Sequence, residues 1–261
     1  MTATALAAPI RVDTSGVRAR PGLGRLVAVE LRKMVDTRAG FWLQVATVAL
    51  TAVVVIVRCM VGAAADHTFA AVLDVAILPA AALLPVAGIL LVTSEWSQRT
   101  GLITFALVPV RSRVLVAKIV ASLGLALAVL VATVAVVAAG VLVASPGSAG
   151  AWADAAALIG QTAVFLTTGI VIGVAFGAML LASAPALVVL FALPAAWMAA
   201  VSLPFFGGIA PWVDTARALG PMHAEVMSAT QWAHAGSALA IWMVLPLLIG
   251  AWRITRRAVA A

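Results

Sequence analysis

Charged side chains are scarce in this sequence. Only 10% of its 261 residues are Asp, Glu, Lys or Arg, whereas 65% are hydrophobic. A soluble domain of this size needs more polar surface, so the composition excludes one. The hydrophobic runs are long and lack the alternation typical of barrel strands, and they therefore predict membrane-spanning helices.

Motifs for catalysis and metal binding are also missing. The single cysteine, Cys59, excludes an internal disulfide and a cysteine-based metal cage. The three histidines occur in no HxxxH or HExxH pattern, so we expect no metal site. No GxxxxGK[ST] loop is present, and any ATP hydrolysis linked to this chain must come from another polypeptide. We therefore expect no catalytic residues and disfavour a membrane-embedded enzyme.

The net charge of +7 does not indicate nucleic acid as a partner. The basic residues flank the hydrophobic runs and do not form a stripe with interleaved aromatic side chains. With both termini in the cytoplasm, 14 of the 16 Lys and Arg residues lie inside, and only Arg58 and Arg217 lie outside. We expect a multi-pass protein of the bacterial inner membrane in this orientation.

Six hydrophobic runs are long enough to cross a bilayer, which takes about 20 residues per helix. The split between the fourth and fifth depends on Ser183, Ala184 and Pro185. We predict an all-α membrane protein with one six-span domain, residues 24–257, after a disordered cytoplasmic tail, residues 1–23. The predicted spans are residues 41–57, 71–93, 114–143, 155–182, 186–203 and 237–252.

Residues 24–38, before the first span, have helical periodicity. Hydrophobic residues form one face of this helix, and charged residues form the other. Such a pattern predicts an interfacial helix with its basic side toward anionic lipid, or else an N-terminal extension of the first span. The charged face consists of Arg25, Glu30, Arg32, Lys33 and Asp36.

The segment 94–118, SEWSQRTGLITFALVPVRSRVLVAK, is a basic island between two hydrophobic runs. Thr100-Gly101 breaks the chain, and Pro109 ends the short apolar stretch that follows. Glu95 and Arg99, four residues apart, can pair on one helical face. The pattern predicts a short amphipathic helix on the cytoplasmic face, although enforcing topology is an alternative role for its charges. Three basic residues complete the segment: Arg111, Arg113 and Lys118.

Polar residues and glycines within the spans are the remaining candidates. The polar ones either line a substrate path or bond to their own helix backbone; they are Gln44, Thr47, Thr51, Gln161 and Thr168. Gly169, Gly173 and Gly177 recur every four residues, which indicates close helix packing within the bundle or at a dimer seam.

The segment 204–235, before the last span, contains too many Pro and Gly residues to form one helix. We expect it outside the cell, with short pieces at 212–219 and 223–232.

The order of these parts resembles the permease subunit of type-2 ABC transporters, the group that contains small bacterial drug and antibiotic exporters. The resemblance covers about residues 24–257. It rests on the helix ending ELRKMVDTRAGFW, the 94–118 island, the six spans and the broken segment before the last span.

In that family, the loop between spans two and three carries a coupling helix that docks in the ATPase subunit. The resemblance places Glu95, Arg99, Thr100 and Gly101 at the start of this helix. It places Pro109, Arg111, Arg113 and Lys118 at its end. It also implies that helix 24–38 is the family's connecting helix, which touches the ATPase as well.

We therefore expect the transmembrane subunit of an ATP-driven exporter, with ATP and Mg bound by a separate ATPase subunit. A second permease copy, identical or related, completes the pathway in the lipid bilayer. The alternative is a non-transport membrane anchor or sensor module that docks a cytoplasmic partner.

Overall fold

The computed structural model describes residues 22–62, 66–97, 111–148, 150–201, 205 and 207–256. Within these ranges the regular structure is helical, and no strand occurs. Six helices are long and apolar enough to cross a membrane, which confirms the predicted all-α, six-span architecture. They are Arg38–Met60, Phe69–Glu95, Ser112–Ala144, Ala155–Leu180, Ser183–Ala200 and Ala229–Arg256.

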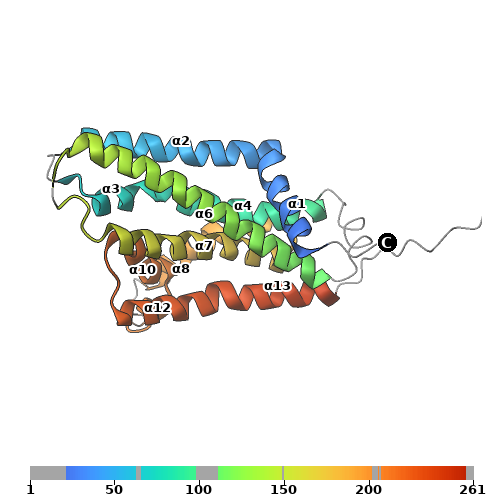
Figure 1. Cartoon of the computed structure of the whole chain (residues 1–261). Coiled ribbons are helices and arrows are strands. Elements are labelled where there is room, and N and C mark those ends of the chain that lie inside the picture. The colour runs from blue at the N-terminus through green and yellow to red at the C-terminus, as the bar shows by residue number, and fades with distance from the viewer. Residues whose placement is uncertain are drawn as a thin grey trace, which may run out of the picture.

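The long helices run side by side, and α1 crosses them at one end of the bundle (Figure 1). The elements of the N-terminal half are α1 (Leu23–Asp36), α2 (Arg38–Met60), α3 (Phe69–Ala76), α4 (Leu78–Ser97) and α6 (Arg111–Ala144). Those of the C-terminal half are α7 (Ala155–Leu180), α8 (Ser183–Val201), α9 (Ala210–Val213), α10 (Thr215–Leu219), α11 (Pro221–Ala224), α12 (Ala229–Leu239), the π-helical turn η3 (Ala240–Val244) and α13 (Leu245–Arg256).

Two breaks divide the hydrophobic runs. The second span is interrupted at Ile77, between α3 and α4, just before Pro79, whose ring is incompatible with a continuous helix. The fourth and fifth spans are separate, as predicted. Leu181 takes a left-handed conformation (φ 56°) that ends α7, and α8 begins at Ser183.

The centre of the bundle is the seam between α4 and α7, where glycines let the two backbones touch. A Cβ atom added at Gly173 would overlap the carbonyl oxygen of Pro85, and one at Gly88 would overlap that of Ile170. A Cβ at Gly177 would lie 3.1 Å from the Ile89 oxygen. Two of the three predicted packing glycines therefore face α4 within the bundle. The third, Gly169, would meet only the Pro85 ring, at 3.9 Å.

The segment before the last span differs in detail from the prediction. The expected piece 212–219 is two short helices, α9 and α10, because Asp214 caps the second one. The expected piece 223–232 does not form. Instead α11 ends at Ala224, and the last span begins at Ala229, well before the predicted residue 237. A capping box between Ser228 and Gln231 starts this helix early.

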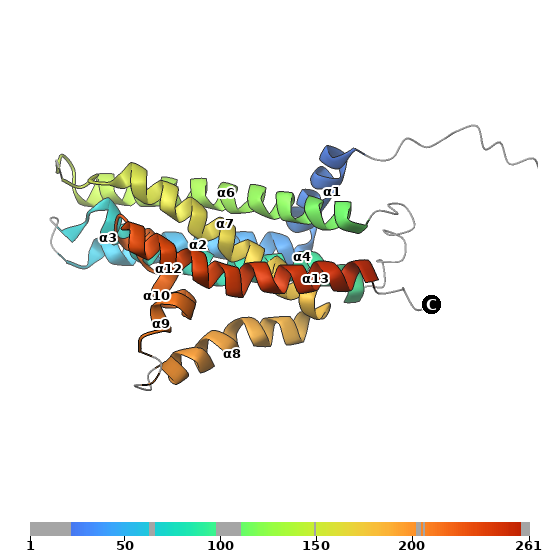
Figure 2. The same ribbon diagram turned by 90° about the horizontal axis from the view of Figure 1, so that it is seen from below.

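Helix α8 stands apart from the other spans. It begins beside the bundle and diverges along its length (Figure 2). Only 6% of its hydrophobic stretch is buried within the protein, compared with 50% for α7. A hydrogen bond of 2.7 Å between the hydroxyls of Thr93 and Ser183 holds its first turn to α4. The bundle therefore has one rigid seam and one loosely attached span.

Candidate functional site

Four charged side chains from three helices meet at the end of the bundle that carries α1. They are Glu30 and Lys33 of α1, Glu95 of α4 and Lys118 of α6, and we call them the charge quartet. The side chains of Lys118, Glu30 and Glu95 are only 4%, 5% and 7% exposed. Lys33 closes the cluster on its outer side, with 38% of its side chain exposed.

The quartet forms a ring in which each ammonium group contacts both carboxylates. Lys33 Nζ lies 2.7 Å from Glu30 Oε1 and 2.8 Å from Glu95 Oε1. Lys118 Nζ lies 2.7 Å from Glu30 Oε2 and 3.1 Å from Glu95 Oε1, and it donates a third bond to the Leu91 carbonyl. Two positive and two negative charges therefore cancel locally, which makes the burial of Glu30, Glu95 and Lys118 tolerable.

Electrostatics within the quartet favour the charged form of Lys33. Burial lowers the pKa of its ammonium, but the hydrogen bonds and charges of Glu30 and Glu95 outweigh burial, so the net pKa lies above the usual value. Lys33 therefore stays protonated at neutral pH. Both lysines of the chain belong to the quartet, and every other basic residue in the sequence except histidine is an arginine.

The position of the quartet matters because it brackets the segment 98–110. Glu95 lies in the last turn of α4, before this segment, and Lys118 lies in the second turn of α6, after it. Through Glu30 and Lys33, helix α1 is fixed to both ends of the same segment. The start of α1, the end of α4, the start of α6 and the end of α13 all lie at this end of the bundle (Figure 1).

The quartet corrects one sequence prediction. Glu30 and Lys33 were expected on the polar outer face of α1, but both turn toward α4 and α6; Arg25 and Arg32 do lie exposed. Glu95 contacts the two lysines, and its predicted pairing with Arg99 is not tested, because Arg99 lies outside the described residues.

A signal in the sequence could have revealed the buried carboxylate. Glu30 comes four residues after Leu26 and four before Met34, so it lies on the hydrophobic stripe of the helix. Lys118 likewise lies four residues after Val114, which is buried. A charge on a hydrophobic stripe requires a buried partner. The sequence does not show which partner, because the four residues come from three separate helices.

The structure describes only some of the other predicted coupling residues. Arg99, Thr100, Gly101 and Pro109 lie outside the described residues. Arg111 is the first residue of α6, and Arg113 is half-buried in its first turn. Of the predicted coupling region, the structure therefore describes only the flanking helices α4 and α6.

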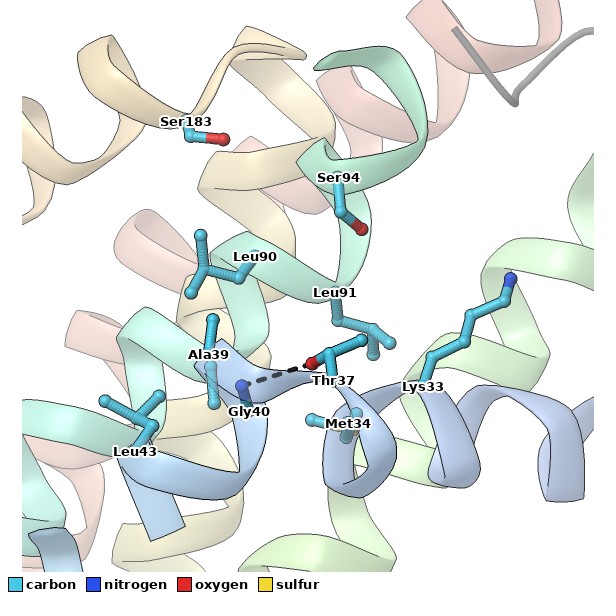
Figure 3. A pocket seen from close by; sticks show the side chains of 11 residues that line it. Lys33, Met34, Thr37, Ala39, Gly40, Leu43, Leu90, Leu91, Ser94 and Ser183 are labelled. Atoms are coloured by element: carbon cyan, nitrogen blue, oxygen red, sulfur yellow. Dashed lines mark hydrogen bonds between the residues drawn. The ribbon is translucent and has the colours of Figure 1, made fainter. Parts of the chain in front are cut away.

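Beside the quartet lies a cavity of about 230 Å³, at the elbow between α1 and α2 (Figure 3). Met34, Leu43 and Leu90 form its apolar wall, and Lys33, Thr37, Ser94 and Ser183 contribute polar atoms. The elbow itself is tight. The Gly40 N–H donates to the Thr37 hydroxyl over 3.1 Å, and a Cβ at Gly40 would overlap the Met34 carbonyl oxygen. The angle between α1 and α2 is thus set by this turn and by the quartet.

The candidate substrate-path residues have other partners. Thr47 and Thr168 donate to carbonyls of their own helices, and Thr51 lies 3.4 Å from the Ala76 carbonyl. Gln161 holds the segment before the last span: it donates to the Glu225 carbonyl at 2.7 Å and accepts from the Met227 N–H at 2.8 Å. Gln44 is half-buried, with its side-chain oxygen unpaired among the described residues.

No ligand cluster for a metal occurs among the described residues, since no three His, Cys, Asp or Glu side chains converge there. His223 Nδ1 and Asp74 Oδ1 form a pair at 2.9 Å, to which no third such side chain is added among these residues.

No protein-family model matches this sequence, and a search of curated proteins finds no match.

Proposed function

We propose that this chain is the transmembrane subunit of an ATP-driven exporter and that a separate ATPase subunit supplies the chemistry. The charge quartet carries the proposal. A partner that pushes on segment 98–110 would move α4, α6 and α1 together, because buried ion pairs join the three helices at the base of that segment. The absence of a phosphate-binding loop in the sequence explains why a docking surface is needed.

Orientation supports the same proposal. Arg25, Arg32, Arg113 and Arg253 belong to helix ends at the pole that carries α1, whereas Arg58 and Arg217 belong to elements at the other pole. The excess of Lys and Arg at the first pole supports a cytoplasmic location for the quartet and both termini, because cytoplasmic loops carry more Lys and Arg. Segment 98–110 then faces the compartment that holds ATP. A second permease copy would complete the pathway.

The test is co-purification of the full chain with an ABC-type ATPase subunit encoded beside it, followed by measurement of ATP turnover. We expect a complex whose turnover differs from that of the ATPase alone. Arg99→Glu should weaken the complex or remove the effect on turnover while membrane insertion is unchanged. Arg256→Glu is a matched control for insertion and expression, because Arg256 is exposed at the end of α13, at the same pole, and lies outside both predicted docking elements.

Two results distinguish the alternatives. A stable complex without any effect on ATP turnover favours a non-transport anchor or sensor module that docks a cytoplasmic partner. The absence of a complex, with the chain correctly inserted, overturns the proposal.

A further inference from the structure

A second cavity, of about 240 Å³, lies where α8 diverges from the bundle. Figure 2 shows α8 set apart, with α9 and α10 beside its far end. Gly169 and Phe176 of α7 form the inner wall, Leu193 and Trp197 of α8 form the outer wall, and Leu219 of α10 covers one end. Ala81 and Pro85 of α4 and Trp242 of η3 also line the cavity.

The lining selects against polar ligands. It includes no charged side chain, and its Trp242 indole N–H already donates to the Val213 carbonyl at 2.7 Å. A charged or polyhydroxylated molecule would lose its hydrogen bonds to water here without replacing them, at a cost of several kcal/mol. The cavity therefore suits a hydrocarbon ligand.

The size of the cavity and its depth in the membrane indicate which hydrocarbon ligand it holds. It is larger than the roughly 150 Å³ apolar cavity that holds one benzene ring. All its walls except α10 belong to membrane-spanning helices, so the cavity lies at the depth of the lipid tails. Its outer wall is the least buried span. At that depth, acyl chains of bilayer lipids are by far the most abundant hydrocarbon.

We propose that this cavity binds one acyl chain of a bilayer lipid, between α7 and α8 and beneath α10. Gly169 is the residue that keeps the space open, because a Cβ added there would meet only the Pro85 ring, at 3.9 Å. The bound chain fills the gap that α8 leaves and supports its position. This inference goes beyond the proposed function and does not depend on any ATPase partner.

The test uses the full chain in phosphatidylcholine–phosphatidylglycerol vesicles that contain a trace of phosphatidylcholine with a diazirine in its acyl chain. After photolysis, labelled residues are mapped by mass spectrometry. Phe176 and Leu219 are the diagnostic positions, because both line the cavity and expose only 5% and 6% of their surface. We expect label on both, in addition to general labelling of Ile56, which is 56% exposed on α2.

Filling the cavity should remove the diagnostic label. Gly169→Leu is expected to lower labelling of Phe176 and Leu219 by about tenfold, since an overpacked site excludes the chain. Gly160→Leu is the matched control on the same helix, because a Cβ at Gly160 has no neighbour within 4 Å; it should leave all labelling unchanged. Ala81→Phe fills the cavity from α4 and serves if Gly169→Leu does not fold.

Three outcomes would overturn the inference. One is labelling confined to exposed positions such as Ile56. Another is labelling of Phe176 and Leu219 that persists in both filled variants. The third is labelling of these residues by a free diazirine fatty acid but not by the phospholipid, which would make the occupant a free acid and not a lipid tail.

Discussion

The two ends of the bundle are held together by different chemistry. At the end that carries α1, two carboxylates and two ammonium groups form one ring, of which only Lys33 reaches the surface. At the end that carries α11, neutral hydrogen bonds from Gln161 hold the segment before the last span, and the His223–Asp74 pair has 48% of the Asp74 side chain exposed. The two ends therefore differ in the free energy that is lost when one of these contacts is broken.

A buried ion pair is expensive to break, because removal of one partner leaves an unpaired charge in an apolar environment. The bonds of Gln161 are also buried, but they are neutral, and losing a neutral hydrogen bond costs less than leaving a charge unpaired. The helices at the first end are therefore held together more strongly than the elements at the second end.

Lys118→Met should have the largest effect, because it leaves Glu30 and Glu95 with only the Lys33 ammonium. We expect the free energy of unfolding to fall by about 3–5 kcal/mol, measured by equilibrium unfolding in bicelles. Arg32→Met, on the exposed face of α1, should change it by less than about 0.5 kcal/mol.

The double variant Glu30→Gln/Lys118→Met should recover much of the lost stability, since Lys33 and Glu95 remain paired. Wild-type stability of the single variant would show that the quartet does not hold this end. A double variant that is no more stable than Lys118→Met would also show this.

The second-largest effect is expected at the seam between α4 and α7, which connects the two ends. Gly173→Ala pushes a methyl group into the Pro85 carbonyl, so we expect a loss of about 1–3 kcal/mol. Gly160→Ala on the same helix has open space and should be neutral or stabilising by up to about 1 kcal/mol. Thermal unfolding in detergent compares the two variants directly. Equal midpoints would mean that α4 and α7 are not in backbone contact.

The smallest effect is expected at the opposite end. Gln161→Ala removes the bonds to the Glu225 carbonyl and the Met227 N–H, and because local opening lets water reach the freed groups, we expect a loss of only about 1 kcal/mol. Amide hydrogen exchange should therefore speed up in residues 221–228 and stay unchanged in α1. Faster exchange in both places would show that the two ends are coupled and not independent.

The membrane spans could be predicted from the sequence, because hydrophobicity determines them. Features that depend on tertiary contacts could not. All six spans follow from runs of apolar residues, and the turn before Pro185 correctly separates the fourth from the fifth. The early start of the last helix was also readable, because Ser228 and Gln231 form a capping box three residues apart.

Other features had no local signal. The hydrophobic stretch of α8 reads like those of α7 and α2, so nothing in its own sequence indicates that it diverges from the bundle. The quartet is similar: each charge is visible on its own helix, but its partners are set by how α1 crosses α4 and α6.

The most direct test of the account is ATP turnover by the complex of the ATPase subunit with Glu30→Gln/Lys118→Met, in liposomes. This variant keeps the Lys33–Glu95 pair but has no ion pair between α1 and α6. We predict that it folds and binds the ATPase, yet loses the effect that the wild-type chain has on turnover. A bound variant that changes turnover as fully as the wild type would contradict the claim that the quartet transmits force from segment 98–110.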